Sequence, residues 1–402
     1  MKKSAVALAT FTTLAAFGSL AQAQSSVTLY GIVDAGVESF TNQDNNSSRT
    51  RFSGNGGELP NLWGLKGSED LGGGTKAIFN LEGTMNMGSG QGTSNSIHTP
   101  LNSDGGLFGR QAFVGLSGGW GTVKLGLQED PAFLSMVATD PRGGKQSFSG
   151  LQTWINSTKY MVGLGNVYDS SSPVQTTTLN IFDQNAISYG FNGYGFDVGV
   201  LYALGGTSGG SSHNSLFSAG GTYKNGGLVI GVGTFHDQTN GPIVVNSRNN
   251  YTYTNVTEYN VGAGYSWSDW TVKGYWMDVK PNRESNLGFN NGLAGIDEYQ
   301  TIGIGGTYKW SNALSFNAAY YATKDQTLGG HVRMVALGLD YELSKRTGLY
   351  ALYGSSRNGG GNGFGDSTVP GTGTGATLTQ SGTINQYGMT SNGVVLGLNH
   401  KF

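Results

Sequence analysis

Apolar and polar residues alternate in short segments through most of the chain. In residues 195–205, the even-numbered positions from Phe196 to Leu204 are all apolar, whereas most odd-numbered positions are small or polar. The same period of two occurs in residues 298–310 and 331–343. Successive side chains of a β-strand point to opposite faces. Each segment therefore predicts a strand with one apolar face and one small or polar face.

The connections between these segments alternate between tight turns and long polar loops. Asn-Gly pairs supply the positive φ angles that two-residue hairpins need. Seven short turns are predicted, at residues 68–74, 118–119, 192–193, 225–227, 268–269, 311–312 and 344–345. Eight long loops are predicted near residues 39–57, 87–107, 129–183, 206–213, 239–253, 281–297, 326–330 and 358–388. Together these connections join about sixteen strands, an even number that suits a closed single-chain barrel.

A soluble β-sandwich would also show alternating strands, but three features favour a membrane barrel. The strands are about ten residues long or longer, which is enough to cross the hydrocarbon region when tilted. Aromatic residues such as Trp267, Trp270 and Tyr308 collect beside the short turns, as in the aromatic girdle of a barrel. Short turns on one side and long loops on the other are also typical of such barrels. We therefore predict an all-β, transmembrane antiparallel β-barrel.

The composition agrees with this fold class and excludes others. Glycine accounts for 69 of 402 residues, and only 12% of residues are charged. So much glycine argues against a helical bundle, because each glycine destabilises a helix by about 1 kcal/mol. The chain has no cysteine, so no disulfide can stabilise it. A net charge of -2 without a clustered basic face argues against a nucleic-acid partner.

The N-terminus has the three parts of a secretory signal peptide. Lysines follow Met1, residues 5–17 are mostly apolar, and Ala21-Gln22-Ala23 offers a small-x-small cleavage site. The alternative is a membrane anchor, but the apolar stretch is shorter than the ~20 residues that a spanning helix needs. We expect a signal peptide over residues 1–23, cleavage between Ala23 and Gln24, and one barrel domain over residues 24–402.

Several segments together resemble one known family. They are residues 25–37, 63–79, 110–117, 121–126 and 395–402, and they resemble the Gram-negative general porins of β-proteobacteria. The resemblance implies a homotrimeric outer-membrane porin, a passive diffusion channel for ions and small hydrophilic solutes without a cofactor. It also implies a third loop, here 129–183, that folds into the lumen and narrows it. The resemblance further implies three partners, which are outer-membrane lipid, lipopolysaccharide and the barrel-insertion machinery. That machinery would recognise Phe402 as a C-terminal signal.

The chain departs from the family at the pore. Relatives carry a ladder of basic residues on the wall opposite the third loop, but the matching positions here are Leu62, Leu127 and Ser188. Either these bases are lost, or the local match has slipped, or other cations substitute for them. The cations that could substitute are Arg110, Lys124 and Lys159.

The charges of the third loop bear on ion selectivity. Its acids outnumber its bases, with Glu129, Asp130, Asp140, Asp169 and Asp183 against Arg142, Lys145 and Lys159. Because rings of charge set permeability at a constriction, we hypothesise a pore less anion-selective than its relatives, with weak cation preference or little preference. For each acid, a solvated surface carboxylate is the alternative interpretation.

Two other classes of protein fit the sequence poorly. An outer-membrane hydrolase needs a converging catalytic set, but the five histidines are scattered and show no metal-ligand spacing. A secreted β-solenoid needs a short fixed repeat, and the sequence has none. We therefore predict a protein that is not an enzyme.

Overall fold

The barrel wall is a single antiparallel sheet. The computed structural model describes residues 26–43, 47–93, 107–154, 181–205, 215–238, 241–245, 249–283, 298–326, 330–359 and 390–402. Within these residues, nineteen strands belong to the sheet, and sixteen of them form the wall. The wall strands are β1 (Ser26–Gln43), β3 (Leu62–Gly72), β4 (Thr75–Met85), β6 (Gln111–Gly118), β7 (Gly121–Glu129), β8 (Phe182–Gly193), β9 (Phe196–Ala203), β10 (Ser215–Asn225), β11 (Leu228–Gln238), β13 (Asn249–Trp267), β14 (Trp270–Arg283), β15 (Tyr299–Lys309), β16 (Leu314–Asp325), β17 (His331–Glu342), β18 (Thr347–Gly359) and β19 (Thr390–Lys401).

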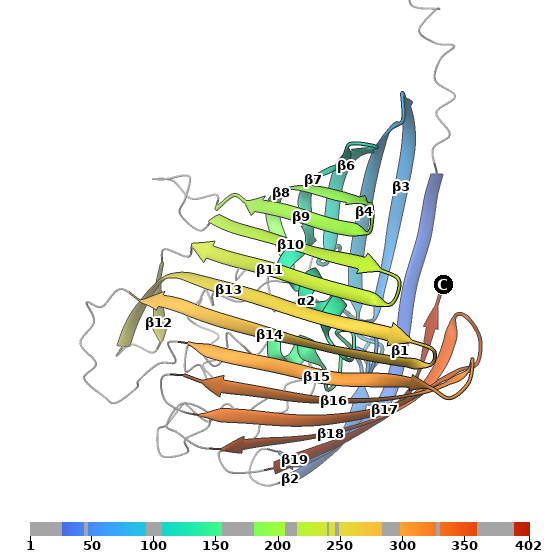
Figure 1. Cartoon of the computed structure of the whole chain (residues 1–402), viewed down its shortest axis with the longest axis vertical. Coiled ribbons are helices and arrows are strands. Elements are labelled where there is room, and N and C mark those ends of the chain that lie inside the picture. The colour runs from blue at the N-terminus through green and yellow to red at the C-terminus, as the bar shows by residue number, and fades with distance from the viewer. Residues whose placement is uncertain are drawn as a thin grey trace, which may run out of the picture.

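The first and last strands close the ring. The second half of β1 pairs with β19, from Ile32 opposite Lys401 to Phe40 opposite Gly393, while its first half pairs with β3. Each wall strand therefore has two neighbours, and the backbone groups that lipid cannot solvate are paired. The predicted closed barrel of sixteen antiparallel strands is confirmed (Figure 1).

Two of the predicted long loops contain additional strand. Residues 39–57 include the end of β1 and its partner β2 (Ser47–Ser53), and residues 239–253 include β12 (Gly241–Val245) and the start of β13. β-Branched and aromatic residues there, such as Thr50 and Phe52 in the first loop and Tyr251 and Tyr253 in the second, favour extended backbone, so the strands run further than predicted. A third short strand, β5 (Gly92–Thr93), pairs with the end of β4.

One predicted turn is displaced by two residues. Gly193 pairs with Phe196, so the hairpin between β8 and β9 turns at Tyr194 and Gly195 and not at residues 192–193. Tyr194 and Gly195 have φ angles of 55° and 83°, which are the two positive values of a type I′ turn. The turn at Ser268 and Asp269 lies where it is predicted, between the paired residues Trp267 and Trp270.

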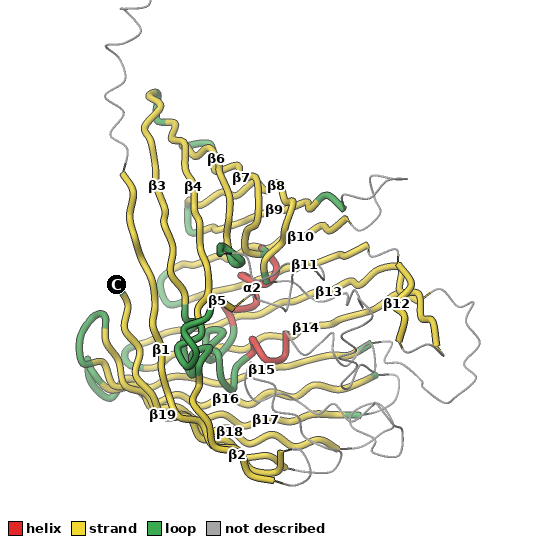
Figure 2. Tube along the Cα trace, turned by 180° about the vertical axis from the view of Figure 1, so that it is seen from behind, coloured by secondary structure: helices red, strands yellow, loops and turns green. Residues whose placement is uncertain are grey.

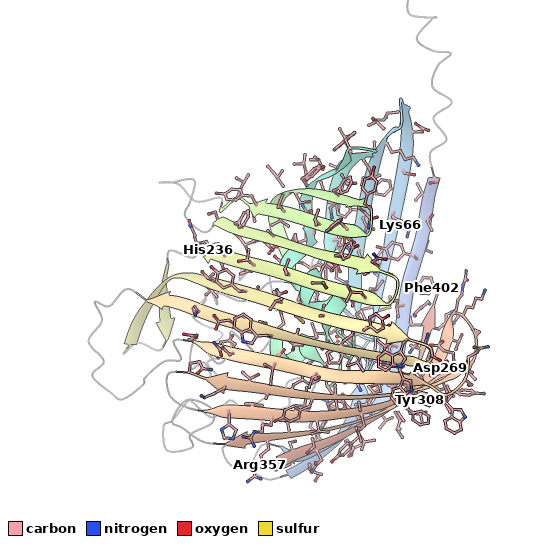
Figure 3. All side chains as sticks on the ribbon, viewed as in Figure 1. Lys66, His236, Asp269, Tyr308, Arg357 and Phe402 are labelled. Carbon is pink, nitrogen blue, oxygen red and sulfur yellow. The ribbon has the colours of Figure 1, made fainter. Side chains whose placement is uncertain are left out.

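The outward face of the wall is apolar and carries aromatic residues near the short turns. The rings of Trp270 and Tyr308 lie 4.5 Å apart, and those of Phe196 and Tyr223 lie 4.8 Å apart. Figure 3 places Tyr308 near Asp269 and Phe402 at the turn end of the barrel. This band confirms the predicted aromatic girdle at one membrane interface.

A helix lies inside the ring. It is α2 (Pro131–Thr139), which follows β7 and packs against the inner side of β10, β11 and β13 (Figures 1 and 2). No helix among the described residues has the length and hydropathy to span a bilayer. The predicted cleavage site at Ala23 and Gln24 lies outside the described residues.

Candidate pore lining

The described part of the third loop begins with a capped helix. Asp130 has an extended backbone, and its carboxylate accepts a hydrogen bond of 2.8 Å from the Phe133 N–H. Pro131 follows at the first helical position, where a missing N–H is tolerated. Burial raises the pKa of the Asp130 carboxyl to about 6, although the hydrogen bond from Phe133 opposes this shift. The sequence Asp-Pro thus starts the helix at the point where β7 ends.

A row of glycines on the inner wall accommodates this helix. Gly190, Gly199, Gly220 and Gly233 face one another in register across β8, β9, β10 and β11. A Cβ at Gly220 would overlap the Pro131 carbonyl, and one at Gly233 would lie 2.9 Å from the Ala132 Cα. The backbone of α2 can approach the wall this closely because these positions have no side chain.

Polar contacts fix the next part of the loop to the wall. The Asp140 carboxylate accepts hydrogen bonds from Tyr321 Oη at 2.9 Å, from the Gly150 N–H at 3.1 Å and from the Gly144 N–H at 2.7 Å. Burial raises the pKa of Asp140, while these hydrogen bonds oppose the shift. Asp140 is therefore an internal anchor of the loop.

Two basic residues of the same loop also bond to the wall. Arg142 hydrogen-bonds to Asn317 on β16. Lys145 forms ion pairs with Asp340 on β17, at 2.8 Å, and with Glu58. Both cations are therefore engaged with wall or loop groups and are not free charges in the lumen.

Apolar side chains complete the attachment. Phe148 and Trp154 are fully buried, and Phe148 lies beside Phe40 with ring centroids 6.3 Å apart. Trp154 packs edge-on against Phe133 and Phe235. Burial of each such ring stabilises the loop by about 1.5–3 kcal/mol. Residues 130–154 are thus attached to one side of the wall by packing as well as by hydrogen bonds.

A second segment inside the barrel was not expected from the sequence. Residues 54–61 lie against Asp34 of β1, whose carboxylate accepts hydrogen bonds from the N–H groups of Gly57 and Leu59 at 2.9 and 2.7 Å and from Tyr350 Oη at 2.5 Å. Burial raises the pKa of Glu58, within this segment, to about 7, with Lys145 opposing the shift and Asp340 adding to it. No local sequence signal marks this contact, because its partners are distant in the chain.

The three positions where the family resemblance predicts bases are uncharged and shielded. Leu62 and Ser188 are buried, and Ser188 donates a hydrogen bond to Gln128. Leu127 is half-buried and packs against the apolar cluster around α2.

Two of the cations suggested as substitutes lie on the inner face of the wall. Arg110 bonds to Glu82 at 2.5 Å and approaches Glu129 at 4.0 Å. The Lys124 ammonium lies 5.0 Å from the ring centroid of Phe113. The third suggested cation, Lys159, lies outside the described residues.

Most acids of the third loop do not face open space. Asp130, Asp140 and Asp183 are almost completely buried, which corrects the expectation that the first two line the constriction. Hydrogen bonds from the Phe133 N–H to Asp130 and from the Gly144 N–H to Asp140 compensate the burial of these two carboxylates. Glu129 keeps 31% of its side chain exposed, and Asp169 lies outside the described residues. The acid count of the sequence therefore overestimates the negative charge at the pore surface.

The open surface of α2 is apolar, and basic residues border it. Leu134 is 45% exposed, and Val137 and Ala138 are half-buried on the helix face turned away from the wall. A cavity of about 270 Å³ beside this face is lined by Leu134, Lys124, Lys224 and also by the acids Glu129 and Asp197. The site can accept a solute with both an apolar part and a charge. The described residues include no group of His, Cys, Asp and Glu side chains suited to hold a metal ion.

Comparisons with known proteins agree with this architecture. The family described as "Gram-negative porin" matches residues 7–361. An outer membrane porin protein of Bordetella pertussis is 30% identical over 393 residues, covering 88% of this chain and 94% of that protein. The major outer membrane protein P.IB of Neisseria meningitidis is 28% identical and covers 90% of this chain and 95% of its own length.

Solved structures show the same fold. An anion-selective porin from Comamonas acidovorans superposes with a TM-score of 0.72 at 24% identity, covering 94% of this chain and 100% of that one. At this identity the likeness concerns the fold alone.

Proposed function

Because the chain belongs to the Gram-negative porin family, we propose that its barrel is a passive diffusion channel for ions and small hydrophilic solutes. The protein is a transmembrane β-barrel of the outer membrane. Family and fold point to a channel and not to an enzyme. Passive flow needs no catalytic group or cofactor, so the relevant residues are those that set the width and the electric field of the lumen.

The observation that carries this proposal is the attachment of residues 130–154 to one side of the inner wall. Glycines, buried rings and the Asp140 anchor hold this segment against β10 to β18. The inner faces of β3, β4 and β7 carry Lys66, Lys76 and Lys124, and Lys124 borders the cavity beside α2. In the proposed channel, solutes pass between the helix and these lysines.

Charge selectivity follows from which of the charges are accessible. Lys66 and Lys76 are exposed and Lys124 is partly exposed, whereas Asp130, Asp140 and Asp183 are buried. The accessible acids beside Lys124 are Glu129 and Asp197, which weaken the anion preference without reversing it. We propose weak anion preference, which replaces the weak cation preference inferred from counting loop acids. The sequence left open the alternative that Arg110 and Lys124 take the place of the missing bases. That alternative supports a weak anion preference. Arg110 contributes less than Lys124, since Glu82 neutralises it.

The exposed face of α2 adds a preference for partly apolar solutes. Leu134 and Ala138 line the cavity that Lys124 and Lys224 also border. Because Glu129 and Asp197 line the same cavity, solutes that combine an apolar part with a charged group of either sign fit this lining.

Other expected properties remain proposals that the family supports. They are assembly as a homotrimer, removal of residues 1–23, narrowing of the pore by loop 129–183, and recognition of Phe402 by the insertion machinery. Glu129, Arg142 and Lys145 are proposed to shape the constriction. For the two cations this role is indirect, through their bonds to the wall.

Single-channel recording in planar bilayers tests the channel proposal. We expect steps of constant conductance that rise linearly with salt concentration, as diffusion through a water-filled pore requires. Liposomes that contain the protein should swell in small sugars and more slowly in larger ones. Saturation of the conductance at moderate salt, or no swelling with any sugar, would contradict free diffusion.

A further inference from the structure

Two arginines face each other on the outside of the barrel. Arg333 on β17 and Arg357 on β18 are directly paired in register, and both are exposed. They share the outward side of the wall with Val335 and Leu337, which are also exposed. Like charges at directly opposed positions of neighbouring strands destabilise a sheet. The pair therefore needs a compensating anion.

Two more basic side chains extend this patch. His331 lies two residues before Arg333 on the same side of β17, and its Nε2 lies 2.9 Å from where a Cβ at Gly359 would be. Lys324 on β16 is exposed and pairs in register with His331. We call Lys324, His331, Arg333 and Arg357 the outer basic patch.

No acid balances the patch among the described side chains. Neither arginine forms an ion pair or a hydrogen bond with a described residue. The acids on the neighbouring outward surface, Asp278 and Glu298, pair instead with Lys280 at 2.9 and 3.4 Å. Lys280 thus shows how an outward cation is neutralised within the wall, and the outer basic patch lacks such a partner.

The position of the patch indicates the source of the anion. Arg357 lies at the loop end of the strands, opposite the end where Tyr308, Asp269 and Phe402 lie (Figure 3). Short turns face the periplasm in barrels of this type, so the loop end lies at the outer leaflet. Tyr353 lies four residues before Arg357 on the same outward face of β18, and its side chain is exposed. Exposed aromatic residues of this kind are typical of the membrane–water interface of a barrel.

We propose that the outer basic patch binds the phosphate groups of lipopolysaccharide in the outer leaflet. Arginine suits this ligand because its planar guanidinium donates two parallel hydrogen bonds to a phosphate. Two guanidiniums on opposed residues form a fork for one phosphate, with His331 and Lys324 at its edge. The site is on the lipid-facing side and is independent of the channel lumen.

Binding of lipid A to the full-length protein in detergent tests the proposal. The variant Arg333→Gln/Arg357→Gln should bind bisphosphorylated lipid A at least about tenfold more weakly than wild type, because two charge-assisted contacts are lost. The control is Lys280→Gln, which removes an outward cation that already has acid partners and should leave affinity within about twofold. Lipid A should also raise the melting temperature of the wild type more than that of the double variant.

Three results would overturn the proposal. Equal binding of dephosphorylated lipid A would exclude the phosphate as the ligand, and equal binding of phosphatidylglycerol would exclude selection of lipopolysaccharide. A double variant that keeps lipid A affinity but changes its oligomeric state would assign the patch to a contact between copies of the chain. Misfolding is separated from these outcomes by the variant's melting temperature without lipid, which should equal or exceed that of wild type since the arginine repulsion is gone.

Discussion

Phe402 and Gly31 close the barrel together. Their backbones exchange two hydrogen bonds, from Gly31 N–H to the Phe402 carbonyl at 3.1 Å and from Phe402 N–H to the Gly31 carbonyl at 3.0 Å. The Phe402 ring lies over the Gly31 Cα, in the space that a side chain there would occupy. The last residue of the chain is thus fitted to a glycine of the first strand.

This fit predicts that Gly31→Val hinders closure. The valine must displace the Phe402 ring, and overpacking of this kind typically destabilises by about 1–3 kcal/mol. After refolding in detergent, the variant should melt at a lower temperature and show less of the fast-migrating folded form in unheated gels. Gly31→Val/Phe402→Ala should recover part of the loss. The control Gly119→Val alters a glycine whose Cβ would contact nothing and should behave as wild type.

The glycine row predicts a second effect, on conductance. Gly220→Ala should push Pro131 and α2 away from the wall, since a Cβ there would overlap the Pro131 carbonyl. The helix then occupies more of the lumen, and single-channel conductance should fall. Gly190→Ala is the matched control in the same row, because its Cβ would lie 3.5 Å from the nearest atom, the Val198 carbonyl. Equal conductance of the two variants would show that the row does not position the helix.

The helix cap predicts a difference between two substitutions of one residue. Asp130→Ala removes the acceptor for the Phe133 N–H and should destabilise α2 by about 1 kcal/mol. Asp130→Asn keeps an acceptor and removes a charge that burial already disfavours, so it should be nearly neutral. Hydrogen exchange of residues 131–139 measures this, with faster exchange expected in the alanine variant alone. Equal protection of both variants would contradict the capping role.

The raised pKa of Glu58 predicts pH-dependent selectivity. With a pKa of about 7, Glu58 gains a proton as the pH falls from about 8 to about 6, and Lys145 then keeps one acid partner in place of two. The wall beside the lumen becomes more positive by one charge. Anion preference should therefore increase on acidification, and Glu58→Gln should remove that part of the change. Reversal potentials recorded at the two pH values test this. A wild-type pore that becomes less anion-preferring at the lower pH would contradict the assignment.

The wall could be predicted from the sequence, whereas the lumen could not. Strand faces follow from the period of two, and the turn at Ser268 and Asp269 from local turn chemistry. The hairpin turns at Tyr194 and Gly195 because the sequence Asn192-Gly193-Tyr194-Gly195 offers two overlapping pairs that end in glycine, and local turn chemistry does not choose between them. A glycine excess is visible in the composition, but its alignment across β8 to β11 depends on strand register.

The burial of the loop acids needed three-dimensional contacts. From the sequence alone, Asp140 has the features of an exposed loop carboxylate. In the fold it is buried and accepts a hydrogen bond from Tyr321, which is 181 residues away in the chain. Asp34 likewise gives no local sign that residues 54–61 fold onto it. Charge counting along a loop fails for this reason, since it cannot separate buried anchors from charges that a solute meets.

The reversal potential across a salt gradient tests the central claim most directly. With about tenfold more KCl on one side of a planar bilayer at neutral pH, the proposed basic lining predicts a potential of the sign that chloride preference gives. Lys66→Gln/Lys124→Gln should move that potential towards zero without abolishing conductance. A wild-type potential of the opposite sign, unchanged in the double variant, would contradict the account and restore the cation preference first inferred from the loop acids.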